Sequence, residues 1–245
     1  MFEIRPINLI TYKLQEHNHD VFGNIPLVFR SDEFSLLSGW IFAKVEKNII
    51  IEHVEQETSW WCWIASAVMF MKHYFPFFGT KDNQTQEACA LAVKGTTADP
   101  SGSAYDSLKY FLGTIGSSLD VTCTHEKIYS EDTLMKFLDD GHVLIIHRLW
   151  YNYQNGMYVF DNIRVGHFYV LSGYVTIQGK TWFILHDPSN SDDDESEATL
   201  MTYQKLRCGY DRTEDELRDD GFWCCAIVVN TEYSKNTISW KEPNG

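Results

Sequence analysis

The order of hydrophobic and polar positions divides the chain into an extended start, a helical middle and an extended end. Residues 1–54 contain short runs rich in β-branched and aromatic residues with polar interruptions, which is typical of strands. From Cys62 to about Tyr74 apolar residues occupy nearly every side of a helix, as a buried helix requires. Pro76 follows and favours the end of that helix.

Three more helices and a second extended region are predicted after Pro76. The helices span residues 84–94, 103–112 and 131–139, and Ser130 is expected to cap the last of them. The strands that follow are expected at residues 143–146, 167–175, 180–186, 199–203 and 222–230, with a hairpin turn at 177–179. Helices and strands are therefore segregated along the chain, which predicts an α+β fold and not alternating βαβ units.

Length and charge narrow the possible functions. A chain of 245 residues with 44% hydrophobic residues can form one large domain, or two small subdomains that share a core. The formal net charge of −14 argues against nucleic-acid binding, because a phosphate backbone would be repelled. No apolar run approaches the roughly 20 residues that span a bilayer, so no membrane partner is expected. The N-terminus shows no cleavable signal, which predicts a cytoplasmic protein or export without such a signal.

The cysteines and acidic residues do not indicate a metal site or cofactor. The six cysteines include no CxxC pair and the nine histidines are scattered, so no zinc site is expected. The adjacent Cys224 and Cys225 lie in an apolar run and are interpreted as two small core residues of a buried strand. The acidic run at 192–197 is interpreted as a solvated loop; calcium binding by its carboxylates is the alternative, but the glycine of an EF-hand calcium loop is missing.

Cys62 is the candidate nucleophile. A thiol attacks as a thiolate, so it needs a neighbour that favours ionisation. The N-terminus of a helix provides unpaired N–H groups and a positive dipole end, and Cys62 is expected to begin the first helix. An imidazole that takes the proton would provide the second requirement, and such a base can lie far along the chain.

The residues around Cys62 resemble the active-site segment of papain-like cysteine proteases. In the string from Gln56 to Ser66, a glutamine stands six residues before the cysteine, and Trp63 follows it. The string is most similar to bacterial papain-like peptidases, effector proteases and bacteriocin leader peptidases. The resemblance implies a papain-like fold, with a helical subdomain led by the Cys62 helix and an antiparallel β subdomain. It also assigns the Gln56 side chain and the Cys62 backbone N–H to an oxyanion hole.

Later segments match the same family in the same order. Residues 166–174 resemble the strand that carries the general base, which would be His167. Residues 186–188 resemble the turn whose Asp or Asn orients that imidazole, which would be Asp187. Residues 138–145 and 203–207 also look like the family's helix-end and Tyr-containing segments. The matched blocks extend from about residue 54 to 230, which is most of the chain.

Several roles remain open at this stage. His186 is an alternative base, because only one of the two histidines can face Cys62 and the parity of the hairpin decides which one. Asp161 or Asn162 is an alternative to Asp187. His142 and His147 flank a buried strand and are interpreted as structural. Trp60, Trp61 and Gly166 are predicted to bind substrate, the two tryptophans as subsite walls and not as core residues.

The sequence thus predicts an N-terminal β-rich extension of unknown role at residues 1–53 and a papain-like catalytic domain at 54–245. The predicted function is hydrolysis of peptide bonds in a peptide or protein substrate, through a thioester intermediate and without metal or organic cofactor. Deamidation of a protein glutamine, or acyl transfer, would use the same residues. A binding module on an inactive papain-like scaffold is the non-enzymatic alternative.

Overall fold

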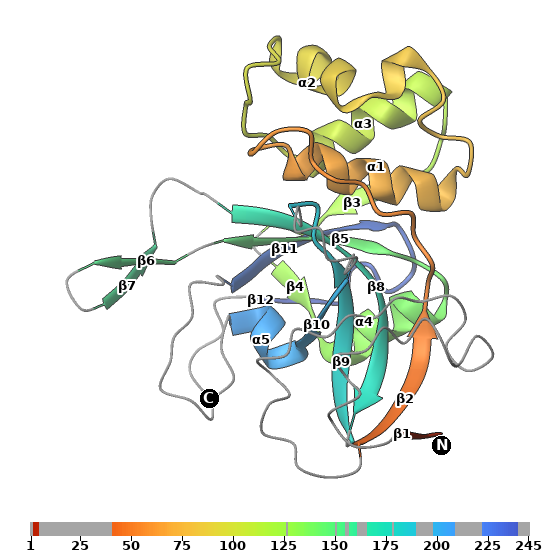
Figure 1. Cartoon of the computed structure of the whole chain (residues 1–245), viewed down its shortest axis with the longest axis vertical. Coiled ribbons are helices and arrows are strands. Elements are labelled where there is room, and N and C mark those ends of the chain that lie inside the picture. The colour runs from red at the N-terminus through yellow and green to blue at the C-terminus, as the bar shows by residue number, and fades with distance from the viewer. Residues whose placement is uncertain are drawn as a thin grey trace.

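The predicted helical and extended parts occupy different regions of the molecule. The computed structural model describes residues 2–4, 41–125, 127–149, 151–154, 157–160, 166–177, 179–189, 198–208 and 222–239. Within them, α1 to α3 gather at one end, and the large sheet with α4 and α5 forms the rest (Figure 1). The acidic run at 192–197 and the alternative residues Asp161 and Asn162 lie outside the described residues.

The helices lie close to their predicted positions. They are α1 (Cys62–Tyr74), α2 (Gln86–Lys94), α3 (Ala104–Ile115), α4 (Glu131–Asp139) and α5 (Tyr203–Cys208), with a short 3-10 turn, η3 (Asp82–Gln84). The predicted bounds of α1 and α4 are confirmed. Helix α2 begins two residues later than predicted because the Thr85 side chain accepts a hydrogen bond from the Ala88 N–H and so caps it. Helix α3 continues past its predicted end at residue 112 to Ile115, and the positive φ of Gly116 then ends it.

The strands form one large antiparallel sheet and two small ones. The strands are β1 (Phe2–Ile4), β2 (Ile41–Asn48), β3 (Val121–Cys123), β4 (Lys127–Tyr129), β5 (Leu144–Leu149), β6 (Tyr151–Gln154), β7 (Met157–Phe160), β8 (Gly166–Ile177), β9 (Lys180–His186), β10 (Thr199–Thr202), β11 (Phe222–Val229) and β12 (Thr237–Ser239). The large sheet has the order β1-β2-β8-β5-β11-β3, and β9 pairs with β8 and β10. The pairs β6–β7 and β4–β12 are separate from it. Strands β3, β4, β6, β7 and β12 were not predicted from the sequence.

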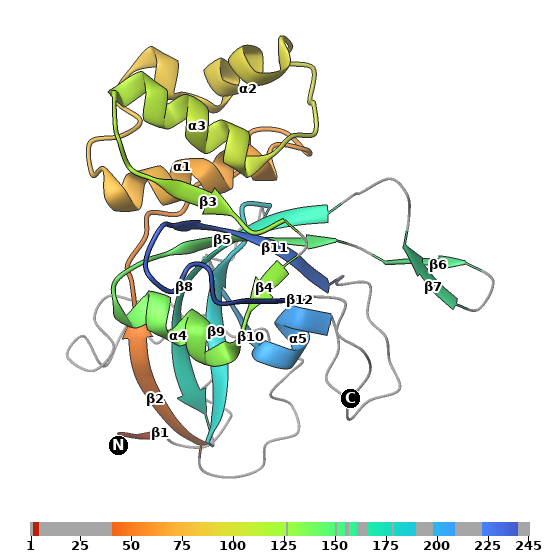
Figure 2. The same cartoon turned by 180° about the vertical axis from the view of Figure 1, so that it is seen from behind.

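Alternate residues of the central strands enter two different cores. Ile145, Phe168 and Ile227 pack with the helical layer, whereas their neighbours Ile146 and Tyr169 pack on the opposite face. That opposite core also contains residues of α4, β4 and α5, which cover this side of the sheet (Figure 2). The period of two along each strand explains the division. The sheet is therefore buried on both faces where β5, β8 and β11 lie side by side.

The segment before α1 is held by the loop that joins α2 to α3. The Thr58 hydroxyl and the Trp60 N–H both donate to the Asp99 carboxylate. Trp63 donates its indole N–H to the Pro100 carbonyl at 3.1 Å, and its ring lies against Gly102. These contacts fix the entry into α1, and with it the position of Cys62.

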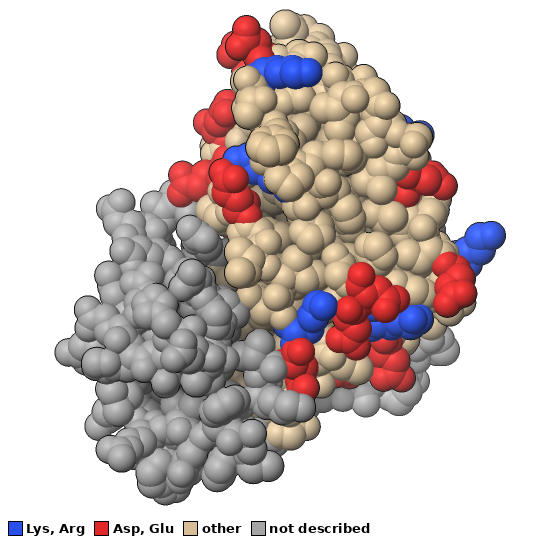
Figure 3. Space-filling view, turned by 90° about the vertical axis from the view of Figure 1, so that its right-hand side faces the viewer, with Lys and Arg blue, Asp and Glu red and all other residues tan. Residues whose placement is uncertain are grey.

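The opposite end of α1 joins the helical layer to the rest of the molecule. His73 Nε2 lies 3.0 Å from the Gly141 carbonyl, and Tyr74 bonds to His142, which matches the structural role predicted for that histidine. Ion pairs at this end include Lys72 with Glu52. Figure 3 shows acidic and basic side chains intermixed on this face, so the net negative charge does not collect there in one patch.

Part of the predicted N-terminal extension belongs to the sheet. Strand β2 pairs with β8 from Ala43 opposite Ile177 to Asn48 opposite Gly173. The predicted domain boundary after residue 53 stays a prediction. None of the helices in the described part of the chain combines the length and the hydropathy needed to cross a bilayer.

We expect Gly102→Ala to destabilise the protein. A Cβ at this position would lie 2.5 Å from the ring of Trp63, which is almost fully buried and braced by Pro100. Overpacking of this kind costs about 1–3 kcal/mol, and denaturant unfolding measures it as a lower midpoint. The control is Gly113→Ala in α3, where nothing lies within 4 Å of an added Cβ. It should stabilise the helix by up to about 1 kcal/mol, and an equal loss in both variants would contradict the account.

Candidate active site

Cys62 is the first residue of α1 and faces the junction of the two layers. Cys62 is 7% exposed, and every residue from Cys62 to Met71 is buried. The first turn of α1 contains no acidic residue and no side chain caps it. The helix therefore presents its positive dipole end and its backbone N–H groups next to the thiol, with no acidic side chain in its own first turn.

The pairing of β8 with β9 brings His167 to Asp187. Val170 is paired with His186, so Asp187 follows the strand at the level of Tyr169. His167 lies two residues before Tyr169 and thus on the same face of the sheet. Its Nε2 atom donates to Asp187 Oδ1 at 2.6 Å. The carboxylate thereby fixes both the tautomer and the orientation of the imidazole.

The other ring nitrogen of His167 faces the thiol of Cys62. His167 forms a side-chain hydrogen bond with Cys62, and because Nε2 is committed to Asp187, Nδ1 is the atom that faces the sulfur. His186, the alternative base, lies instead with its Nε2 3.0 Å from the Ser172 hydroxyl. The structure thus brings Cys62, His167 and Asp187 together in a line, with the imidazole in the middle.

The surroundings of His167 favour its charged form. Burial lowers the pKa of His167, but the hydrogen bonds and charges of Asp187 and Cys62 outweigh this and raise the pKa to about 9. Burial raises the pKa of Asp187, but the hydrogen bond and charge of His167, together with Ser189, hold it below its usual value. Asp187 is therefore a carboxylate, and the imidazole is an imidazolium at neutral pH.

Ser189 is a further neighbour of the site that was not predicted from the sequence. Its backbone N–H and its hydroxyl both donate to Asp187 Oδ1, at 2.8 and 2.7 Å. The carboxylate is thus oriented by the turn that follows it. Part of this signal was present in the sequence, since an aspartate side chain in a turn commonly accepts from the backbone N–H two residues on.

Gln56 is tied to the same turn from the other side of the site. Its backbone N–H donates to the Pro188 carbonyl at 2.9 Å, and its side-chain amide donates to the Ser59 carbonyl at 3.0 Å. The amide group has two N–H donors, so this bond leaves one for another acceptor. Gln86 braces the flanking residues, since its side chain bonds the Glu55 carbonyl and the Glu57 N–H.

The three residues predicted to bind substrate have different environments. Trp60 is 47% exposed and is available as a wall. Trp61 is buried in the core of the helical layer, contrary to the expectation that it would lie outside the core. Gly166 begins β8 opposite Leu149, and an added Cβ would lie 2.3 Å from the Arg148 carbonyl oxygen. The close approach of the β5 and β8 backbones at this point therefore requires glycine. Their roles in substrate binding stay predictions.

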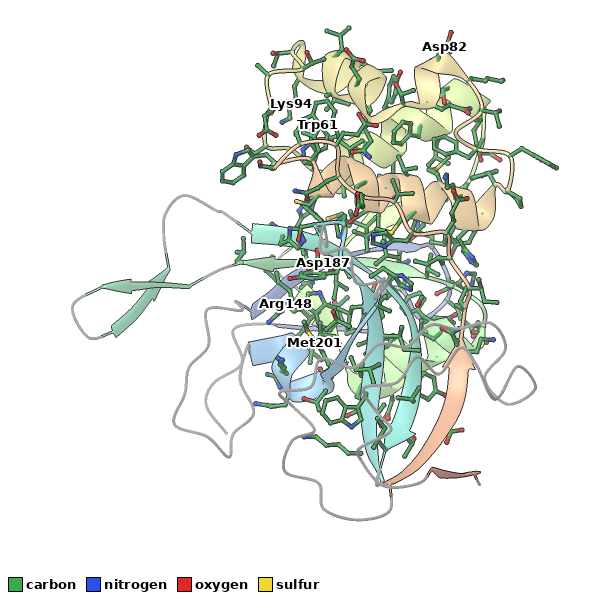
Figure 4. The ribbon with its side chains drawn as sticks, in the orientation of Figure 1. Trp61, Asp82, Lys94, Arg148, Asp187 and Met201 are labelled. Atoms are coloured by element: carbon green, nitrogen blue, oxygen red, sulfur yellow. The ribbon has the colours of Figure 1, made fainter. Side chains whose placement is uncertain are left out.

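Two residues beside His167 were not assigned to the site from the sequence. Arg148 pairs with His167 across β5 and β8, is 1% exposed, and contacts the Tyr169 ring, Met201 and the Lys205 carbonyl (Figure 4). His147 stacks on Phe168, and burial, together with the charge of His167, lowers its pKa to about 4. The predicted strand ended at residue 146, so neither side chain was placed next to the base.

Similarity to known proteins was found at the level of a family and of solved structures. The model of the Peptidase_C39 like family matches residues 49–216. No curated protein matches the chain significantly.

Three solved structures resemble the chain at low identity. A double-glycine-motif protease from an AMS/PCAT transporter, in complex with the leader peptide, shares 16% identity over 77% of this chain and 99% of its own, with a TM-score of 0.41. A protein described as a C39-like peptidase from Bacillus anthracis shares 14% identity over 78% of this chain and 98% of its own, with a TM-score of 0.44. Procathepsin L 3 of the Tenebrio molitor larval midgut shares 11% identity over 77% of this chain and 69% of its own, with a TM-score of 0.46.

The family match covers more than half of the chain and includes Cys62, His167 and Asp187. The resemblance to papain-like cysteine proteases stated from the sequence is thereby confirmed, and so is the α+β papain-like fold. This chain belongs to the Peptidase_C39 like family, a family of papain-like cysteine peptidases.

Proposed function

We propose that this chain is a cysteine peptidase that hydrolyses peptide bonds with Cys62 as nucleophile, His167 as acid and base, Asp187 as orienting carboxylate and Gln56 as oxyanion donor. The observation that carries the proposal is the position of the His167 ring, which hydrogen bonds to Asp187 on one side and to Cys62 on the other. Membership of a cysteine peptidase family supports the same reaction class.

In the first half of the reaction the Cys62 thiolate attacks the carbonyl carbon of the scissile bond. A carbon–sulfur bond forms and the carbonyl oxygen takes the negative charge. The second N–H of the Gln56 amide and the backbone N–H of Cys62 donate to this oxyanion, which is where neutral preorganised donors lower the barrier. His167 then gives its proton to the nitrogen as the carbon–nitrogen bond breaks, and the amine leaves.

In the second half water attacks the thioester. Neutral His167 accepts a proton from that water, the carbon–sulfur bond breaks, and the acid leaves with the Cys62 thiolate and the imidazolium restored. Asp187 remains a carboxylate throughout, because its role is to orient the imidazole and stabilise its charged form. None of these steps requires a group outside the chain except substrate and water.

The expected substrate is a peptide or protein. The absence of nucleic-acid and membrane partners, and a cytoplasmic location or export without a cleavable signal, stay predictions from the sequence. Deamidation and acyl transfer share every step up to the thioester and differ only in what leaves and what attacks it. Analysis of the products distinguishes these reactions.

An epoxysuccinyl inhibitor should label Cys62, and His167→Ala should abolish the labelling because the thiol loses the ring that ionises it. Cys89→Ser is the matched control, because Cys89 is fully buried on α2 and its removal should leave labelling unchanged. Peptide mapping by mass spectrometry locates the label. Equal labelling of His167→Ala would contradict the proposal, and so would the absence of label at Cys62.

Mass spectrometry of a candidate protein substrate then separates the reactions. Chain cleavage gives two fragments whose masses add up to the substrate plus water, and it supports hydrolysis. A small mass increase on an intact chain indicates deamidation, and an added amine indicates acyl transfer. Either result without cleavage would overturn the assignment as a peptidase and retain the roles of Cys62 and His167.

The rate of cleavage should fall as the pH rises through about 9, where His167 loses its proton. The pKa of His167 is raised, so its charged form stabilises the fold fully below the ordinary pKa and this stabilisation is lost as the pH passes about 9. In Asp187→Asn the carboxylate charge is removed, so the pKa of His167 should fall. The decline of the cleavage rate at high pH, the high-pH limb of the pH–rate profile, should then begin at a lower pH.

The control for this pH profile is Asp82→Asn. Asp82 is exposed and lies on the helical layer, well away from Asp187 (Figure 4). The groups that can shift the His167 titration are Asp187, Cys62 and His147, with Arg148 as the cross-strand neighbour. An unchanged limb in Asp187→Asn, or an equal shift in Asp82→Asn, would contradict the assigned role.

Gln56→Ala should lower kcat by about 10²–10³, the usual cost of removing one oxyanion donor. Alkylation of Cys62 by a small alkyl halide forms no oxyanion, so its rate should be retained. This second rate also shows whether Cys62 keeps its position once the bond from Gln56 to Ser59 is lost. A kcat like that of the unsubstituted protein would remove Gln56 from the mechanism.

A further inference from the structure

Three side chains that commonly bind metals lie together on β5 and β11. The ligand atoms of His147, Cys224 and Cys225 all lie within 4.8 Å of one another. Among the described residues, no other group of three or more histidine, cysteine or acidic side chains has this spacing. The group is separate from the proposed catalytic residues, none of which belongs to it.

A β-bulge explains how two consecutive cysteines reach one histidine. In a regular strand successive side chains point to opposite faces of the sheet. Trp223 is paired with Arg148 and Cys225 with His147, so Cys224 is an extra residue between two paired positions. The bulge allows both thiols to approach the same imidazole, and bulges commonly redirect a side chain in this way.

The measured distance between two of these atoms fits a tetrahedral metal site. Cys224 Sγ lies 3.5 Å from His147 Nδ1. Zinc binds sulfur at about 2.3 Å and nitrogen at about 2.0 Å, which places two such ligands of a tetrahedron about 3.5 Å apart. Cys123 forms a side-chain hydrogen bond with Cys225, so a further sulfur lies next to the group.

The surroundings of His147 hold its ring in place. The His147 ring is stacked on Phe168 with centroids 4.2 Å apart and planes 7° apart, which fixes its orientation. By exposed area His147 and Cys225 are intermediate, so neither residue is completely enclosed.

We propose that His147 Nδ1, Cys224 Sγ and Cys225 Sγ bind one zinc ion on the β5–β11 strand pair. Each bound thiol loses its proton to solvent as the metal–sulfur bond forms, so binding releases protons and leaves the oxidation states unchanged. Cys123 lies on the adjacent strand β3, paired with Ile227, and is not one of the three ligands. The sequence alone indicated no such site, because the ligands have no CxxC spacing and the bulge is a property of the strand pairing.

The test uses the full chain with Cys62→Ser, reduced with a phosphine and freed of metal. The substitution removes the other thiol–imidazole pair, so the result does not depend on catalysis. Added Co²⁺ should bind one ion per chain with thiolate-to-cobalt charge transfer and tetrahedral d–d bands, and Zn²⁺ should displace it. About two protons should be released for each Zn²⁺ ion, one from each thiol.

Substitutions identify the ligands. In the same background Cys224→Ser, Cys225→Ser and His147→Asn should each weaken Zn²⁺ binding by at least about 10–100-fold, which is the cost of removing even a partner of a metal ligand. Cys89→Ser should leave the affinity unchanged. Circular dichroism and metal-free unfolding curves show whether each variant is folded.

A measurement without ligand substitutions provides an independent check. Zn²⁺ should slow alkylation of the partly exposed Cys225 in the Cys62→Ser chain, as mapped by mass spectrometry. The proposal is overturned if no one-to-one complex forms, if the three ligand variants bind as tightly as Cys89→Ser, or if Zn²⁺ leaves the alkylation rate of Cys225 unchanged.

Discussion

The proposed chemistry depends on one imidazole that is hydrogen bonded in two directions. His167 contacts Asp187 at 2.6 Å through Nε2 and faces Cys62 with its other nitrogen. Burial alone would favour the neutral ring, but the partners on both sides outweigh burial and make the imidazolium the stable form. A neighbouring imidazolium favours the thiolate, which is the nucleophilic form of a cysteine.

The rest of the fold holds these three groups at the boundary between the helices and the sheet. Cys62 comes from the helical layer, whereas His167 lies on β8 and Asp187 directly follows the neighbouring strand β9. A hydrogen bond from the Gln56 N–H to the Pro188 carbonyl connects the two parts beside the site. Asp99 and Gln86 hold the segment before α1 from within the helical layer. A small movement between the layers would separate the sulfur from the ring, so these bonds act directly on the geometry of the site.

The sequence predicted those features that local patterns determine. Cys62 was located because a buried helix begins there, and His167 and Asp187 were located through the ordered resemblance to papain-like proteases. The choice between His167 and His186 required the pairing of β8 with β9, since one shift in register exchanges the face that each side chain occupies. Short strands such as β3 and β4 were missed because three residues give too little alternation to detect.

Features that arise from strand pairing could not be predicted. The charge of Arg148 interrupts an apolar run, and only the structure shows that the guanidinium is buried beside Tyr169 and contacts Lys205. Cys224 and Cys225 were interpreted as core residues because they lie in an apolar run, whereas the bulge between Trp223 and Cys225 lets both thiols approach His147. Trp61 was expected near substrate from its position before Cys62, yet its side chain packs in the helical core.

The central claim is that His167 is an imidazolium held between Asp187 and Cys62. Nitrogen-15 NMR of the histidine rings, titrated with pH in the unsubstituted protein and in Cys62→Ser, measures this state directly. The account predicts that His167 stays protonated at neutral pH with a pKa of about 9, and that this pKa falls when the thiol is removed. A neutral ring at pH 7, or a pKa that does not respond to the loss of Cys62, would contradict it.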